Sequence, residues 1–262
     1  PLGRRRTVFA DAPETTEIDL NEAMVEREPI TVVVSKKGWI RTLKGHLQDL
    51  GSVAWKGDDS LKFSFFTETT AKILVICDNG KVFTLEASKL PGGRGFGDPI
   101  RLSIDLEESA DFIAAFPYKP GVKLLFASQD GRGFIAPSED VIANTRKGRQ
   151  VLNLDEGARC AFALAVAGDH LAVIGENRKL LCFPMAQVPE MSRGKGVRLQ
   201  KYKDGGISDA KAFDLAEGLT WLSSDGRTYT VAQPDINEWI GARAEAGRLP
   251  PKGFPKNNRF TG

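Results

Sequence analysis

Apolar and polar positions along this chain repeat as pairs of short apolar runs joined by a tight turn. The clearest pair is residues 72–77 and 81–85, joined through Asn79-Gly80. An unbroken apolar run rich in β-branched residues suits a strand that is covered on both faces. Asn-Gly favours a two-residue hairpin turn because both residues tolerate a positive φ. The pattern therefore predicts a β-hairpin here.

Four further segments repeat this order of run, turn and run. They are residues 30–43, 123–137, 170–184 and 218–232, with turns at Lys37-Gly38, Asp130-Gly131, Asn177-Arg178 and Asp225-Gly226. The second turn residues stand at positions 38, 80, 131, 178 and 226, in steps of 42, 51, 47 and 48 residues. A period of about 40 to 50 residues is typical of propeller blades. The regular spacing favours five blades over a β-sandwich whose hairpins happen to look alike.

Short apolar or alternating runs between the hairpins predict the remaining strands of each blade. They are residues 60–67, 110–116, 159–167 and 209–215. The one predicted helix covers residues 235–246, with Asp235 as N-cap after Pro234. We therefore expect an all-β fold, a propeller-like ring or broken arc of about five four-stranded blades.

Composition and charge refine this picture. The 262 residues are 41% hydrophobic and 27% charged, with no apolar run long enough to span a membrane and no signal-peptide core, so we expect a cytoplasmic protein. Three cysteines in apolar runs, Cys77, Cys160 and Cys182, predict buried free thiols. Net charge is +2, but residues 1–28 carry −3 and the remainder +5.

These features divide the chain into three parts. Residues 1–28 lack periodic apolar spacing and predict a linker, with a short helical turn near residues 20–25. Residues 29–249 form the five-bladed domain. Residues 250–262, rich in proline, lysine and asparagine, predict a basic, loosely held tail.

Basic residues gather at one phase of the repeat, about fifteen residues after each turn. The clusters are Arg94 in GGRGFG, Arg146-Lys147-Gly148-Arg149, Arg193-Gly194-Lys195-Gly196 with Arg198, and Arg243 with Arg248. In a ring of blades the same phase means the same rim, so these clusters predict a positive belt for a long polyanion. Glycines beside arginine and lysine suit phosphate oxygens, which carry no sequence information. Phe96, near one loop, is expected in the core rather than on a sugar.

Several stretches resemble a known family. Residues 28–41 (EPITVVVSKKGWIR), 44–46 (KGH), 90–99 (LPGGRGFGDP) and 192–196 (SRGKG) are similar to the C-terminal domain of the A subunit of bacterial DNA topoisomerase IV (ParC), over about residues 29–199. The resemblance implies a β-pinwheel whose blades exchange strands and whose outer edge bends DNA. It also implies a nucleoid-associated domain that helps to select crossings for ATP-dependent strand passage, decatenation and supercoil relaxation in chromosome segregation.

The implied partners are double-stranded DNA, the ATPase subunit, the catalytic core of the same polypeptide and chromosome-organising proteins. The side chains expected to bind DNA are Arg41, Lys44, Arg94, Arg101, Arg146, Lys147, Arg149, Arg193, Lys195, Arg198, Lys201, Arg243 and Arg248. The A subunits of gyrase share the implied fold, but their first blade carries a Gln-Arg-Arg-Gly-Gly type box. The corresponding first-blade loop is expected at residues 46–54, which hold no arginine. Topoisomerase IV is therefore favoured, with a gyrase wrapping domain as the alternative.

No catalytic pattern stands out in the sequence. It has two histidines and none of the common hydrolase, metalloprotease or phosphate-loop motifs. Tyr118, Tyr202 and Tyr229 are assigned no catalysis, since the resemblance places the DNA-cleaving tyrosine in the preceding core. We expect no metal or cofactor in this domain, with ATP and Mg²⁺ used elsewhere in the holoenzyme. The competing class is a protein-docking propeller with an apolar or acidic groove on one face.

Overall fold

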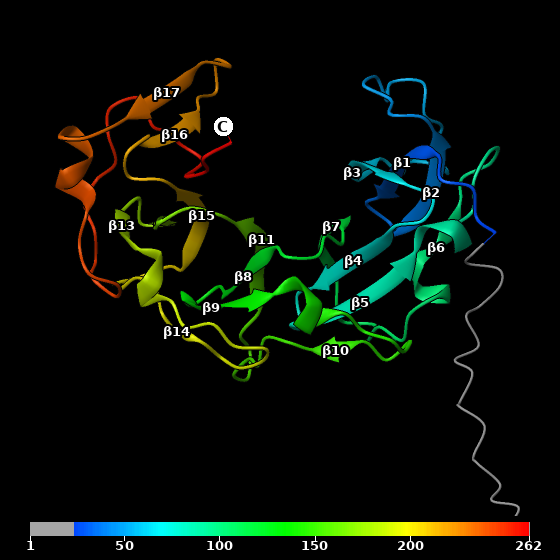
Figure 1. The fold of residues 1–262 in the computed structure, drawn as a ribbon, viewed down its shortest axis with the longest axis horizontal. Helices are drawn as coiled ribbons and strands as arrows, with labels where there is room; N and C mark the ends of the chain where they lie inside the picture. The colour runs from blue at the N-terminus through cyan, green and yellow to red at the C-terminus, as the bar shows by residue number, and fades with distance from the viewer. Residues whose placement is uncertain (1–23, 262) are drawn as a thin grey trace, which may run out of the picture.

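Five antiparallel hairpins organise the computed structural model, which describes residues 24–261 (Figure 1). β1 (Pro29–Ser35) pairs with β2 (Trp39–Lys44), β4 (Lys72–Cys77) with β5 (Lys81–Glu86), β8 (Lys123–Ser128) with β9 (Arg132–Pro137), β12 (His170–Gly175) with β13 (Leu180–Pro184), and β16 (Leu219–Leu222) with β17 (Thr228–Val231). The first strand of each of the first four hairpins is almost wholly buried, as its unbroken apolar run predicts. All five predicted hairpins are confirmed.

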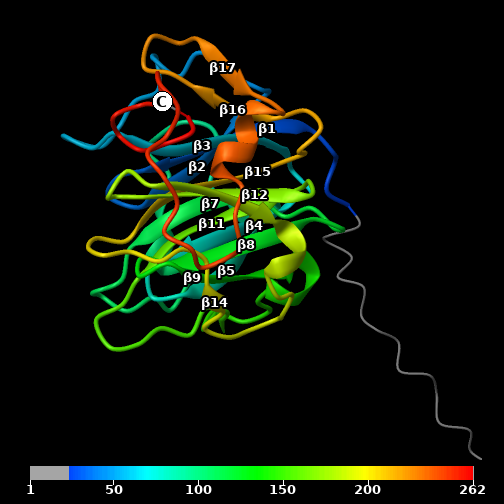
Figure 2. The ribbon, with the colours of Figure 1, turned by 90° about the vertical axis from the view of Figure 1, so that its left-hand side faces the viewer.

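A third strand joins the first strand of four hairpins on the inner side of the arc (Figure 1). These strands are β3 (Leu61–Glu68), β7 (Phe112–Pro117), β11 (Cys160–Val166) and β15 (Ile207–Phe213). They match the four runs predicted between the hairpins. Seen from the side, the strands run across the thickness of the arc (Figure 2).

The outer strand of each of the first three blades comes from the following repeat. β6 (Asp98–Pro99) pairs with β2, β10 (Arg149–Gln150) with β5, and β14 (Val197–Arg198) with β9. On the fourth blade, single bridges Leu180–Arg248 and Cys182–Ile240 take the place of a full strand. The chain thus crosses back over the preceding blade before it continues, which is the strand exchange that the family resemblance implies.

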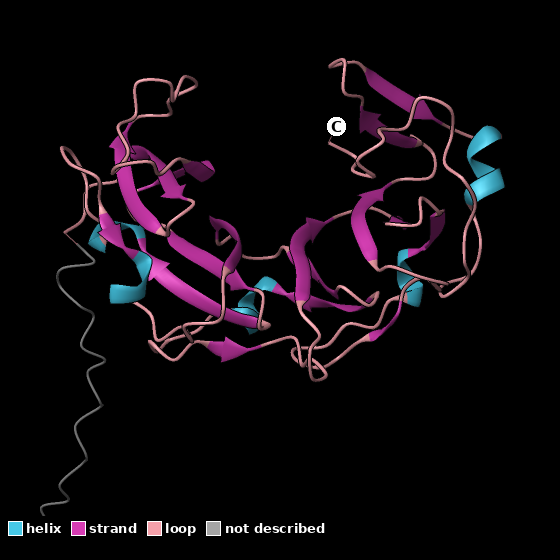
Figure 3. Ribbon diagram, turned by 180° about the vertical axis from the view of Figure 1, so that it is seen from behind, coloured by secondary structure: helices cyan, strands magenta, loops and turns pink. Residues whose placement is uncertain are grey.

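The blades form an open arc, with the first and fifth blades at its two ends (Figures 1 and 3). Three sheets have four strands, the fourth has three and the fifth has two. The expectation of five four-stranded blades is therefore correct for the first three only. Within the described residues, the fifth blade consists of the β16–β17 hairpin without an inner or an outer strand.

The apolar core is shared between neighbouring blades rather than enclosed within each one. Phe83 of the second blade packs in one cluster with Val32 of the first, and Phe183 of the fourth packs with Leu125 of the third. Trp221 of the fifth blade joins a cluster with strands of the fourth. Burial of apolar surface therefore ties each blade to the next. The three cysteines are buried and free, and burial raises the pKa of each thiol to about 12.

The described chain holds only short 3-10 helices, and the helix expected at residues 235–246 is wrong. They are η1 (Ala87–Lys89), η2 (Ile100–Leu102), η3 (Ser138–Val141), η4 (Met185–Gln187) and η5 (Asp235–Trp239). Pro234, not Asp235, caps η5, without a side-chain hydrogen bond. After η5 the chain meets β13 at two single bridges, through Ile240 and Arg248, with a turn at residues 243–244 between them, so tertiary pairing overrides helix propensity. None of the described helices is long and apolar enough to cross a membrane.

The C-terminal segment is packed, in contrast to the loosely held tail that its composition predicts. Phe254 and Phe260 are each only 3% exposed and cluster with Trp221. Arg178 donates hydrogen bonds to the carbonyl oxygens of Phe254 and Pro255, both at 2.8 Å. Two buried aromatic rings and the hydrogen bonds from Arg178 therefore hold this segment against the small fifth blade. Residues 1–23 and 262, including most of the predicted linker and its helical turn, lie outside the described residues.

Candidate nucleic-acid interface

One glycine in each crossing segment fixes how closely that segment approaches the blade beneath it. Gly97, Gly148, Gly196 and Gly247 have φ values of +84°, +68°, +75° and +80°. A Cβ atom at any of them would lie within 3 Å of the strand below; at Gly97 and Gly196 it would be 2.2 Å from a carbonyl oxygen. Only glycine combines this φ with such an approach. The four glycines therefore mark corresponding points of four repeats.

The predicted basic clusters flank these four glycines. Arg94 precedes Gly97; Arg146, Lys147 and Arg149 surround Gly148; Arg193, Lys195 and Arg198 surround Gly196; and Arg243 and Arg248 surround Gly247. All lie on the crossing segments, which run along the outer side of the arc (Figure 3). The structure thus brings the clusters to corresponding places, one on each of the first four blades.

Seven of the predicted contacts are exposed cations whose side chains form no ion pair within residues 24–261. They are Lys44, Arg94, Lys147, Arg149, Arg198, Lys201 and Arg248. Since no carboxylate of the described chain neutralises them, their charge is open to an external anion.

Three other predicted contacts have weak partners at the surface. Arg146 Nε lies 3.4 Å from Asp105 Oδ1, and Arg193 Nε donates to Asn153 Oδ1 at 3.4 Å. Lys195 pairs with Asp155, and this hydrogen bond lowers the pKa of the carboxyl. Exposed ion pairs contribute roughly 0 to 1 kcal/mol, so a phosphate can displace the carboxylates at small cost.

Arg41 is buried, and its assignment to DNA contact is wrong. It is 7% exposed, donates to Ala54 O at 2.9 Å, and also donates to Gly95 O. From its buried position, its guanidinium therefore fixes the loop of residues 92–97 through Gly95 O. The sequence gives no sign of this, because an arginine in a strand of mixed polarity looks the same whichever side it faces.

Two further predicted contacts are engaged by backbone carbonyls. Arg101 donates to Ala110 O at 2.6 Å and Glu107 O at 3.0 Å, which closes the turn before β7. Arg243 donates to Arg198 O at 2.7 Å and so joins two crossing segments. Both side chains therefore hold backbone segments in place.

The outer edge of the first blade is supplied by the second repeat, not by the loop that follows its own hairpin. Residues 46–54 connect β2 to β3 and supply no outer strand. The outer strand of the first blade is β6, preceded by the loop of residues 92–97, which carries Arg94. Because strands are exchanged, the loop that lies on the outer edge of a blade is part of the next repeat in the sequence.

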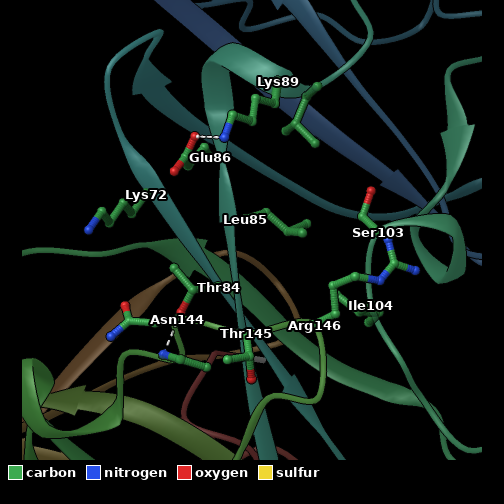
Figure 4. Close-up of a pocket in the computed structure, with 12 residues that line it drawn as sticks. Lys72, Thr84, Leu85, Glu86, Lys89, Ser103, Ile104, Asn144, Thr145 and Arg146 are labelled. Carbon is green, nitrogen blue, oxygen red and sulfur yellow. Dashed lines mark hydrogen bonds and ion pairs between the residues drawn. The ribbon is translucent and has the colours of Figure 1, made fainter. Parts of the chain in front are cut away.

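A cavity of about 440 Å³ opens between η1, β5 and residues 143–146 (Figure 4). Two contacts join groups of its lining: Lys89 Nζ lies 2.8 Å from Glu86 Oε2, and Thr84 Oγ1 accepts a hydrogen bond from Ala143 N at 2.9 Å. Arg146 at its rim belongs to the second basic cluster. Its lining does not bring together a nucleophile and a general base.

Blades in an open arc, with outer strands exchanged between repeats and basic crossing segments, define a β-pinwheel, a propeller-like class of fold. Comparisons with known proteins agree. A family model described as DNA gyrase C-terminal domain, beta-propeller, matches residues 123–167 and 169–207. The E. coli ParC C-terminal domain superposes with a TM-score of 0.75 at 26% identity, over 87% of this chain and 96% of that one. A crystal structure of the C-terminal domain of DNA topoisomerase IV, at 19% identity, shares the fold with a TM-score of 0.68, over 86% of this chain and 73% of that one.

Curated relatives extend the likeness to nearly the whole chain. The A subunit of DNA topoisomerase 4 from Caulobacter vibrioides is 46% identical over 256 residues, which cover 97% of this chain and 33% of the relative. Its counterpart from Rickettsia bellii is 42% identical over 260 residues, 99% of this chain and 35% of the relative. The chain therefore spans about a third of the length of these relatives. It belongs to the family of C-terminal domains found in the A subunits of topoisomerase IV and gyrase.

Proposed function

We propose that this chain is the DNA-binding and DNA-bending accessory domain of a topoisomerase IV A subunit. The observation that carries the proposal is the placement of four basic clusters on corresponding crossing segments of four successive blades. A duplex that follows the outer edge meets Arg94, then the clusters at residues 146–149 and 193–198, and then Arg243 with Arg248. Because the edge is curved, a duplex that reaches several clusters bends.

The contacts are suited to phosphates rather than to bases. The backbone N–H groups of Arg94, Gly95 and Phe96 donate no hydrogen bond within the described chain, and they stand beside an exposed guanidinium. Free N–H groups next to positive-φ glycines form a concavity that accepts anionic oxygens. Phosphate contacts position a duplex without reading its sequence, so binding has low sequence specificity.

In the holoenzyme, this domain holds DNA beside the catalytic core of the same polypeptide and helps to select the crossings that are passed. The catalytic tyrosine, ATP and Mg²⁺ belong to other parts of the assembly, which includes an ATPase subunit. Chromosome-organising proteins are further partners. What supports this role is the 46% identity to the A subunit of a topoisomerase 4, together with the basic outer edge.

The test removes one cluster at a time and measures binding to a duplex at several salt concentrations. Each phosphate contact releases counterions, so log affinity falls linearly with log salt. Changing Arg146, Lys147 and Arg149 to alanine should lower the magnitude of this slope by about 2 to 3 and weaken binding to unrelated sequences about equally. The cluster at Arg193, Lys195 and Arg198 should behave alike.

The matched control removes three exposed lysines that lie outside the crossing segments in sequence, Lys36, Lys37 and Lys56. This variant has the same net charge as each cluster variant and should keep the wild-type slope to within about one unit. Equal losses from the control and cluster variants would mean that only net charge matters. Wild-type slopes in folded cluster variants would favour the protein-docking platform.

A further inference from the structure

Phe96 is an exposed aromatic ring on the outer edge of the first blade. Its side chain is 42% exposed, two residues from the exposed Arg94. The other basic crossing segments, residues 146–149 and 193–198, contain no aromatic residue. The sequence pattern favours a core position for this ring, so its exposure is a finding of the structure.

The loop that presents Phe96 is fixed at its base. Arg41 donates to Gly95 O, Thr42 N donates to Pro91 O at 2.9 Å, and Gly97 lies against Ile40 O. These fixed contacts at its base reduce the conformational entropy that the loop would lose on binding.

The tip of the same loop is open. Gly93 and Gly95 have φ values of +74° and +105°, and a Cβ atom at either would meet nothing within 4 Å. The glycines at the tip therefore serve the backbone conformation and leave space for a ligand. Arg94 and Phe96 stand together at this open tip on a rigid base.

We propose that Phe96 inserts partly into the minor groove of the duplex whose phosphates Arg94 holds, at a flexible pyrimidine–purine step. The inference rests on the proposed function and adds to it an apolar contact beside the electrostatic ones. Inserted apolar side chains unstack a base step from the minor groove and bend the duplex toward the major groove. TA steps open most readily and lack the guanine amino group in the minor groove, so they are the preferred site.

This contact sets the first blade apart from the others. The second and third clusters hold the duplex by charge alone, whereas the first couples charge to a local opening of the DNA. A bend toward the major groove turns the duplex away from the loop that carries Phe96. The first blade is then the place where DNA leaves the outer edge.

The test compares two duplexes of equal length, one with a central TA step and one without, using the whole 262-residue chain. Wild type should bind the TA duplex about 3- to 10-fold more tightly, in line with the size of aromatic contacts to DNA. 2-Aminopurine next to the step should brighten on binding as its stacking is lost. Phe96→Ala should reduce the preference to less than about twofold and abolish the brightening, whereas Phe96→Leu should retain part of both.

Two controls separate this contact from charge and from stability. Phe96→Ala removes no charge, so its salt slope should equal that of wild type, whereas Arg94→Ala should lower the slope by about one unit. Phe66→Ala removes a ring of similar exposure, 39%, from the inner strand β3 and should leave DNA binding unchanged. A wild-type chain that binds with the expected slope but shows no TA preference, or a Phe96→Ala variant that keeps it, overturns this inference alone. A wild-type chain without salt-dependent binding overturns the proposed function as well.

Discussion

Three arginines of this chain have different surroundings and different roles. Arg94 is exposed beside positive-φ glycines, Arg41 is buried against two carbonyl oxygens, and Arg178 bonds to the C-terminal segment. The same planar guanidinium thus serves as an external charge, as an internal brace and as a link between distant segments.

The first prediction contrasts Arg41 with Arg94. Arg41→Ala removes two hydrogen bonds from a buried charged group and leaves carbonyls unpaired, so it should lower the free energy of unfolding by about 2 to 4 kcal/mol. Arg94→Ala should change it by less than about 0.5 kcal/mol. Urea denaturation measures both. Similar, small losses at the two positions would contradict the bracing role of Arg41.

The second prediction concerns the crossing glycines. Gly196→Ala would place a Cβ atom 2.2 Å from Gly133 O at a φ of +75°. Positive φ alone costs alanine about 1 kcal/mol, and the clash should raise the total to about 2 to 4 kcal/mol. Gly226→Ala is the matched control, because Gly226 has a φ of +79° and its Cβ atom would meet nothing within 4 Å. It should cost only the roughly 1 kcal/mol that comes from the positive φ. Thermal unfolding of the two variants measures both stability losses, and equal losses would contradict the close approach at Gly196.

At this scale the sequence predicts residue classes better than residue roles. The phase of the basic residues correctly predicts where Arg94 and the Arg146 cluster lie along the repeat. Neither phase nor composition distinguishes the inward Arg41 from an outward arginine, or the exposed Phe96 from a core ring. Those distinctions depend on which strand of another repeat lies alongside.

At the scale of elements, hairpins are predictable because their information is local. Each turn residue and each apolar run lies within about fifteen residues of its partner, so all five hairpins follow from the sequence. The crossing strands are not predictable in this way. β6, β10 and β14 are two residues long, and their partners lie in another repeat. The same remote pairing explains why residues 240–248 bridge β13 at two points instead of forming a helix.

The third prediction concerns the C-terminal segment as an element of the fifth blade. Arg178→Ala removes hydrogen bonds to Phe254 O, Pro255 O and Asn258 Oδ1, although its position in a turn would suggest that alanine is tolerated. The variant should lose about 1 to 3 kcal/mol and should be cut by protease near residues 251–261 faster than wild type. Arg227→Ala, an exposed arginine of the fifth hairpin, is the control. Equal proteolysis of both variants would contradict the link.

At the scale of the whole molecule, the order of the clusters along the arc makes a test of duplex length informative. Binding should strengthen with duplex length until the duplex reaches from the Arg94 loop to Arg243 and Arg248. Changing Arg248, at one end of this path, to alanine should shorten the length at which affinity saturates. Changing the central cluster at residues 146–149 should weaken binding at every length instead. Gel-shift titrations on a duplex series distinguish the two effects, and identical length profiles would argue against one continuous path.

The whole chain is also predicted to lack strand-passage chemistry of its own. Burial raises the pKa of the Tyr202 hydroxyl, which disfavours the phenolate that nucleophilic attack requires. With ATP and Mg²⁺ present, the chain should neither relax nor cleave supercoiled plasmid on a gel. A protein-linked break that disappears in Tyr118→Phe, Tyr202→Phe or Tyr229→Phe would overturn this.

Strand exchange also sets a counting rule for the basic edge. Because each crossing segment is supplied by the repeat that follows the blade it covers, a chain of n repeats carries n − 1 such segments. This chain has five hairpins and four glycine-marked crossings. Deleting one internal repeat would remove one cluster and also leave the preceding blade to be covered by a segment from a more distant repeat. Gain or loss of repeats should therefore change the length of the proposed DNA path in whole steps.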